Sequence, residues 1–257
     1  MEARPQPVVD LLVLKVLPAA VHCREIGAGP LTYRRKLPTV VPGQRLTVLP
    51  ERRWRWRKTD MVGGDLVSVD FSLRAIHHAG YGRTRHVDGT LVSSGDADAR
   101  LREGILENEG GNWIIGRCLL LDVLEDEPGN LLAHATLGEI HRRFAHHEVA
   151  SAHFTAAIRL GLGALVHDDS LPLDPTGETE RALLRSLVAR AGMLAEAGRR
   201  DAAAADLRRA IAWDPTDCAG AGIELARLLA GESDGGGDAG AGMSATDLRA
   251  GRQEAQR

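Results

Sequence analysis

A change in residue pattern near residue 97 divides this chain into two parts. Within residues 61–73, the apolar Val67, Val69 and Phe71 alternate with polar residues. This period of two predicts a strand with one face in a core and the other in water. From residue 97 onward Ala, Leu, Arg and Glu dominate, and these residues favour helices. We therefore predict a multidomain α and β fold, in which a small β-sheet or barrel-like domain precedes an all-α part.

The predicted β-domain covers residues 1–76 and is basic. Residues 1–96 carry 15 Lys and Arg against 9 Asp and Glu, a balance of +6, whereas residues 97–257 carry 17 against 26, a balance of −9. Such an asymmetry indicates two units with different partners, or with none. Segment 8–17 fits a strand or a helix. The Gly- and Ser-rich residues 77–96 are predicted to form a linker.

Segments 131–164 and 184–217 share a phased set of small and bulky residues. In the first, positions 7, 8, 20, 24 and 27 are Leu137, Gly138, Ala150, Phe154 and Ala157. In the second, Arg190 breaks position 7, while positions 20, 27 and 32 are Ala203, Ala210 and Pro215. This pattern resembles the tetratricopeptide repeat, a 34-residue helix–turn–helix. The resemblance implies a helical-hairpin solenoid whose stacked units bury one another's apolar stripes.

The resemblance also divides the helical part, 97–230, into segments. Residues 97–130 are predicted as a divergent first unit, which keeps Gly104 and Pro128 but otherwise matches poorly. Further expectations are an insertion, a closing helix and a disordered tail, since the last of these has little to bury. They cover residues 165–183, 218–230 and 231–257 respectively.

Tetratricopeptide arrays commonly bind peptides or proteins in a concave face. By resemblance, the positions that line this face are Leu132, Ala135, Glu139, Arg142, Arg143 and Arg185. The arginines are suited to an acidic partner, although solvated surface arginines explain them equally well. Some arrays hold the acidic C-termini of heat-shock chaperones through Lys and Asn at two of these positions. In this sequence those positions are Leu101/Ile105, Ala135/Glu139 and Val188/Gly192, so that clamp is absent.

Motifs for enzymatic chemistry are absent from the sequence. There is no dinucleotide-binding GxGxxG after a strand, phosphate-binding GxxxxGK[ST], HExxH or GxSxG. His141, His146, His147 and His153 crowd one predicted hairpin, but helix packing and the turn account for their places better than a metal, which needs three or four converging ligands. We expect no catalytic residue, metal or cofactor.

Three widely spaced cysteines and the lack of a long apolar run favour a cytoplasmic protein that does not cross a membrane.

The segment RRWRWRKT, residues 52–59, supports two interpretations. Read as a strand, Trp54 and Trp56 share one face and the arginines the other. In the first interpretation, which we adopt as our prediction, the tryptophans are buried in the core of the small domain and the arginines are exposed. In the second, the basic face meets phosphates, or the tryptophans lie outside and stack on bases. The contacts would then be Arg53, Arg55, Arg57 and Lys58.

The sequence therefore predicts a non-enzymatic adaptor or scaffold that binds a protein or peptide in a tetratricopeptide-type groove. The alternative is a nucleic-acid-associated factor whose basic N-terminal domain binds RNA or DNA. The residues do not identify the partner, the pathway or the oligomeric state.

Overall fold

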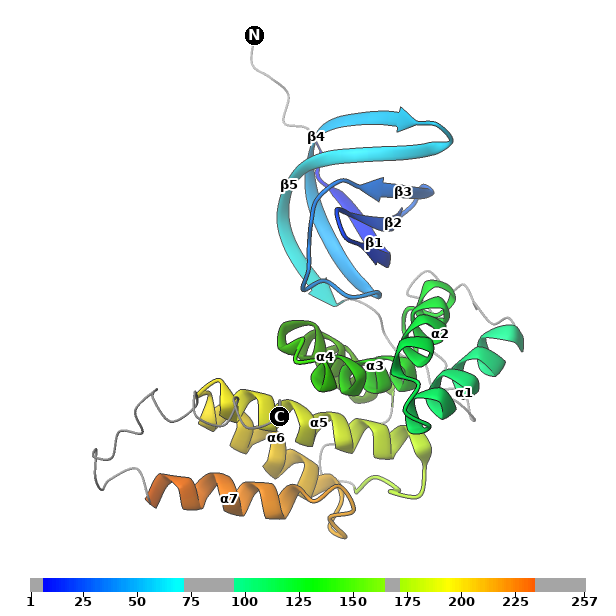
Figure 1. Ribbon diagram of the computed structural model, residues 1–257. Coiled ribbons are helices and arrows are strands. Elements are labelled where there is room, and N and C mark those ends of the chain that lie inside the picture. The colour runs from blue at the N-terminus through cyan, green and yellow to red at the C-terminus, as the bar shows by residue number, and fades with distance from the viewer. Residues whose placement is uncertain (1–6, 72–94, 165–171, 234–257) are drawn as a thin grey trace, which may run out of the picture.

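A computed structural model describes residues 7–71, 95–164 and 172–233. Within them a five-stranded β-barrel is followed by seven helices (Figure 1). The fold class predicted from the sequence is confirmed. Most of the predicted linker 77–96 and of the predicted tail 231–257 lies outside the described residues, and both remain predictions.

The barrel closes by pairing its first strand with its fourth. The strands are β1 (Val9–Leu17), β2 (Ala20–Glu25), β3 (Pro30–Tyr33), β4 (Gln44–Trp56) and β5 (Thr59–Phe71), in the order β1-β2-β3-β5-β4. Only β3 and β5 pair in parallel. The ambiguous segment 8–17 is thus almost entirely strand β1. Its Leu11 and Val13 are fully buried, with Val21, Tyr33, Leu46 and Val62, in the barrel core.

The β4–β5 hairpin is longer than the rest of the barrel needs. Strand β1 pairs with β4 only from Arg45 to Val48, and β3 pairs with β5 only at Met61 and Val62. Residues 51–60 therefore project as an arm, which curves over β3 in Figure 1. Gly64 permits this bend, because a Cβ there would lie 2.1 Å from the Leu49 carbonyl oxygen, beside a break in the β4–β5 register.

The helices form three hairpins and a final single helix. They are α1 (Gly95–Glu109), α2 (Trp113–Asp126), α3 (Leu131–Arg143), α4 (His147–Ala164), α5 (Glu178–Glu196), α6 (Arg200–Trp213) and α7 (Ala221–Ser233). Helix α5 begins before residue 184, where the sequence places the start of its unit, and includes the end of the predicted insertion.

Small residues mark the places where paired helices touch. A Cβ at Gly138 of α3 would lie 2.6 Å from Cε1 of Phe154 of α4, so glycine leaves room for the ring. The first helical segment, residues 97–130, has the same kind of close contact at a glycine. A Cβ at Gly116 of α2 would lie 2.9 Å from the carbonyl oxygen of Gly104 of α1. Residues 95–126 therefore form a closely packed hairpin despite their poor match to the repeat pattern.

The charged residue that breaks the third unit has a partner across its hairpin. Arg190 donates from Nε and Nη2 to the two carboxylate oxygens of Asp206, both at 2.8 Å. The Asp206 side chain is 7% exposed and that of Arg190 is 19% exposed. A bidentate ion pair between α5 and α6 thus occupies the place of an apolar contact.

The barrel and the helices are in direct contact. Leu12 of β1 is buried in the hydrophobic cluster formed by α1, α2, α3 and α4, and Leu14 packs beside it. Lys15 Nζ lies 2.6 Å from Glu125 Oε2 of α2, and Arg159 of α4 lies 3.1 Å from Asp70 of β5. Strand β1 therefore contributes to two cores, with Leu11 and Val13 in the barrel core and Leu12 in the helical cluster.

Candidate binding sites

The inner helices of the hairpins line a groove made of two adjoining hollows. The first, of about 300 Å³, lies between α1, α3 and α5, and Leu132 and Ala135 form part of its wall. The second, of about 570 Å³, continues along α5 to the start of α7, past Val188, Gly192 and Met193. Both hollows include Glu139 and Arg185, which places these two residues at the junction.

The groove brings together five of the six residues that the resemblance assigns to a concave face. Leu132, Ala135, Glu139 and Arg185 line the first hollow, and Arg142 lines the second. Arg143 lines neither, and its guanidinium carbon lies 5.3 Å from the centroid of the Trp113 ring. Whether these residues bind a partner remains a prediction.

Charged residues of both signs lie along the α5 side of this groove. Glu178 and Glu196 stand at the two ends of the helix, and Arg181 and Arg185 lie between them, one turn apart. Arg142 is engaged by Glu139 at 2.8 Å. By contrast, the side chains of Arg181 and Arg185 make no hydrogen bond or ion pair within the described residues. They are available to an anionic group in the groove.

A ladder of histidines lies between α3 and α4. His134 Nε2 is 3.0 Å from the Pro128 carbonyl oxygen, and His134 Nδ1 is 3.0 Å from His153 Nδ1. A carbonyl only accepts, so His134 carries its proton on Nε2 and accepts at Nδ1 from the N–H of His153. The rings of His153 and His141 stack at 5.5 Å. His134 is therefore neutral, and both rings of the first pair are held in a fixed orientation.

Burial disfavours a positive charge in this ladder. It lowers the pKa of His134 to about 4, although the bond to Pro128 opposes the shift. Burial also lowers the pKa of His141 to about 4 and that of His153 well below its usual value. Within the described residues, no group of three or more His, Cys, Asp or Glu side chains is arranged to hold a metal ion. The ladder is a packed part of the hairpin.

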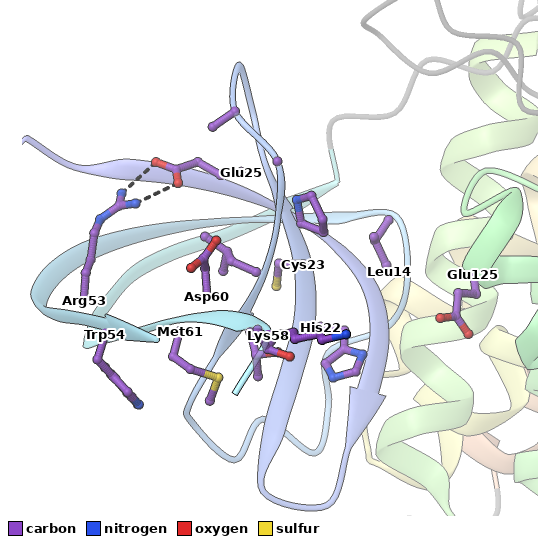
Figure 2. A pocket seen from close by; sticks show the side chains of 16 residues that line it. Leu14, His22, Cys23, Glu25, Arg53, Trp54, Lys58, Asp60, Met61 and Glu125 are labelled. Carbon is purple, nitrogen blue, oxygen red and sulfur yellow. Dashed lines mark hydrogen bonds and ion pairs between the residues drawn. The ribbon is translucent and has the colours of Figure 1, made fainter. Parts of the chain in front are cut away.

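A third hollow, of about 810 Å³, lies on the side of the barrel that faces α2 (Figure 2). Strands β2 and β3 supply His22, Leu31 and Thr32, the β4–β5 arm supplies Trp54, Lys58 and Asp60, and α2 supplies Glu125. Cys23 also lines it, but burial raises the pKa of this thiol to about 12, so the sulfur stays protonated and unreactive.

The tryptophans of the arm are not buried as predicted. Trp56 is 62% exposed and Trp54 is half-buried on the wall of this barrel pocket. The strand itself is as expected, but the arm projects past the barrel, so neither of its faces meets the core. The guanidinium of Arg52 lies 4.6 Å from the centroid of the Trp54 ring, and Gly63 leaves space beside the ring. The prediction of two core tryptophans is therefore wrong.

The four basic residues proposed to meet phosphates divide into two pairs. Arg53 forms a bidentate ion pair with Glu25 at 2.7 and 2.8 Å, which Figure 2 marks with dashed lines. Hydrogen bonding to Arg53 lowers the pKa of the Glu25 carboxyl. Arg55 lies 3.8 Å from Asp60. Arg57 and Lys58 form the turn of the arm, and within the described residues neither side chain has a hydrogen bond or ion pair.

The helical half is thus a stack of tetratricopeptide-like hairpins attached to a small barrel. No family model matches the sequence, and no curated protein matches it. Among solved structures the chain is similar to one described as "First TPR of Spaghetti (RPAP3) bound to HSP90 peptide SRMEEVD". The two are 14% identical with a TM-score of 0.43, and the match covers 55% of this chain and 96% of the other. Within the described residues, no helix has the length and apolarity that spanning a membrane requires.

Sequence reasoning missed two features of these sites. Arg181 lies at a position that the repeat pattern does not assign to the groove, and it enters because α5 begins at Glu178. The barrel pocket depends on β2, β3 and the arm coming together across the chain, which no local pattern shows. The sequence also holds a signal for the close packing of the first hairpin, which is Gly116, a second small residue that lies against Gly104.

Proposed function

We propose that this chain is a protein-interaction adaptor that holds a segment of a partner in the groove between α1, α3, α5 and α7. The observation that carries the proposal is the continuity of the two hollows through Glu139 and Arg185. Together they offer a path over three hairpins that combines apolar side chains, such as Leu132, Val188 and Met193, with charged side chains of both signs.

The charges of the groove favour a segment with an acidic residue near its middle. Arg181 and Arg185 can each donate to a carboxylate, and a guanidinium can do so through two parallel hydrogen bonds. Glu178 and Glu196 at the ends of α5 favour basic residues farther along the same segment. Charge of this kind mainly selects the partner and its orientation, whereas the apolar residues of the lining supply affinity.

Site-specific photocrosslinking in the full chain tests this proposal. A photoreactive residue at Ala189, on the wall of the second hollow, should capture a discrete partner from a lysate. The matched control is Ala205 on α6, an exposed position outside both hollows, which should capture none. Combining the Ala189 probe with Arg181→Ser and Arg185→Ser should abolish the product. Equal capture from both positions, or from neither, would refute a groove-bound partner.

A further inference from the structure

The β4–β5 arm and the adjoining barrel pocket have the chemistry of a second binding site. Trp56 exposes 62% of its surface, and Trp54 stands on the pocket wall. Large exposed aromatic side chains beside a hollow are characteristic of interaction surfaces, because leaving them in water is unfavourable. The helical groove uses neither residue.

The charge around these rings identifies the kind of ligand. Residues 7–71 carry 11 Lys and Arg against 6 Asp and Glu, a balance of +5. The ion pairs of Arg53 with Glu25 and of Arg55 with Asp60 neutralise part of the arm. Arg57 and Lys58, which remain unpaired within the described residues, stand at its turn. The free charge of the arm is therefore positive and lies next to Trp56.

The turn places Arg57 at the tip of the arm. Its φ of 55° is a left-handed conformation, which Ala145 and Asp217 also adopt in turns between helices, so this φ belongs to the turn and does not by itself mark a site. The turn directs the cation away from the barrel core.

We propose that the arm binds single-stranded nucleic acid. A base stacks on Trp56, a second base enters the pocket beside Trp54, and Arg57 and Lys58, at the turn that follows Trp56, contact two phosphates next to these bases. Every base has a flat aromatic face, so this arrangement does not depend on sequence. Successive side chains on one face of a strand are about 7 Å apart, a spacing that an unstacked strand can match.

Helix α2 limits the path of the nucleic-acid strand. Glu125 lines the pocket opposite the arm, and Lys15 holds its carboxylate at 2.6 Å. The pairing leaves no free cation on this wall, so the sugar–phosphate backbone stays on the side of the arm, where Arg57 and Lys58 lie. The bases, which carry no charge, are the part that faces the pocket.

Fluorescence anisotropy of labelled oligothymidylate and oligouridylate of about twelve nucleotides, with the full chain at low salt, tests the proposal. Binding of either oligonucleotide supports the proposal, and comparison of the two affinities distinguishes DNA from RNA. We expect Trp56→Ala to weaken binding about tenfold and Trp56→Phe to retain most of it. Trp56 is exposed, so unchanged circular dichroism should accompany the loss.

The cations are tested through salt. Arg57→Ser with Lys58→Ser should flatten the slope of log affinity against log salt by about 1.4 units, the value for two phosphates of a single strand. The matched control is Arg199→Ser with Arg208→Ser, two exposed arginines of the helical half, which should leave the slope unchanged.

Three results would overturn the proposal. The first is no binding of either oligonucleotide at low salt, which would make the exposed rings a contact for protein. The second is equal binding by Trp56→Ala. The third is competition by inorganic polyphosphate as effective as that by unlabelled oligonucleotide, because polyphosphate has charge but no bases.

Discussion

Alanine should destabilise the helical part at Gly138 and stabilise it at Gly192. Both glycines lie inside helices, so each substitution gains about 1 kcal/mol of helix propensity. At Gly138 the added Cβ would lie 2.6, 2.7 and 2.9 Å from Cε1, Cδ1 and Cζ of Phe154. At Gly192 it would meet nothing within 4 Å. The two sites thus differ in packing and share the same gain in propensity.

The magnitude follows from this comparison. Forcing an extra carbon into a filled core costs about 1–3 kcal/mol. The shared propensity cancels between the two variants, so Gly192→Ala should exceed Gly138→Ala in unfolding free energy by about 1–3 kcal/mol. Relative to the unsubstituted chain, Gly192→Ala should gain about 1 kcal/mol.

Urea denaturation of the full chain, followed by far-ultraviolet circular dichroism, measures the difference. The helices dominate this signal, so the helical transition is the one to compare. Equal unfolding free energies for the two variants would refute the close contact of α3 with Phe154. A loss at Gly192 would show that another group occupies the space beside it.

Three other perturbations test separate parts of the structure. Asp206→Ala should cost about 3 kcal/mol because it leaves the partly buried Arg190 with a 3.4 Å hydrogen bond to Thr155 Oγ1 and no carboxylate, and Arg190→Leu with Asp206→Leu should recover most of it in the same denaturation assay. As pH falls from 6.5 toward 4, the free energy of unfolding should decline by about 3 kcal/mol from His134 alone. The cause is that His134 becomes protonated in the unfolded chain, while burial keeps it neutral in the folded one. An unfolding midpoint that does not change over this pH range would contradict the buried neutral ring. Because the groove lacks the Lys and Asn clamp for an acidic C-terminus, amidating the C-terminus of a labelled peptide SRMEEVD should leave its anisotropy titration unchanged, whereas Arg185→Ser should weaken any binding through the central glutamates; binding lost on amidation would overturn that reasoning.

The helical hairpins were accessible from sequence because their rules are local. Gly138 and Phe154 lie 16 residues apart in one unit, and their spacing alone indicates that they meet. The break at Arg190 was also visible, but its explanation required Asp206 on the next helix. A charge that interrupts an apolar stripe can be recognised from sequence, whereas its partner depends on the three-dimensional packing.

The barrel was less predictable because its contacts are between distant segments. Alternation correctly indicated strands around Trp54 and Val67, yet it cannot show where a sheet ends. The arm extends past the pairing of β1 and β3, so Trp56 has no core to enter. Its burial was inferred from residue type, and the position of the strand within the barrel decided otherwise.

Because Leu12 of β1 packs among the helices, the two ends of the repeat stack differ. Strand β1 covers part of the first hairpin, which still exposes Ile114 and Ile115 at 68% and 53%, whereas no described strand covers the last helix, α7, where Ile223 and Leu229 are exposed at 60% and 43%. Additional repeats could be grafted after α7, where they would cover apolar surface, but not before α1 without displacing the barrel. Lengthening of this array, by evolution or by design, is therefore expected at the α7 end.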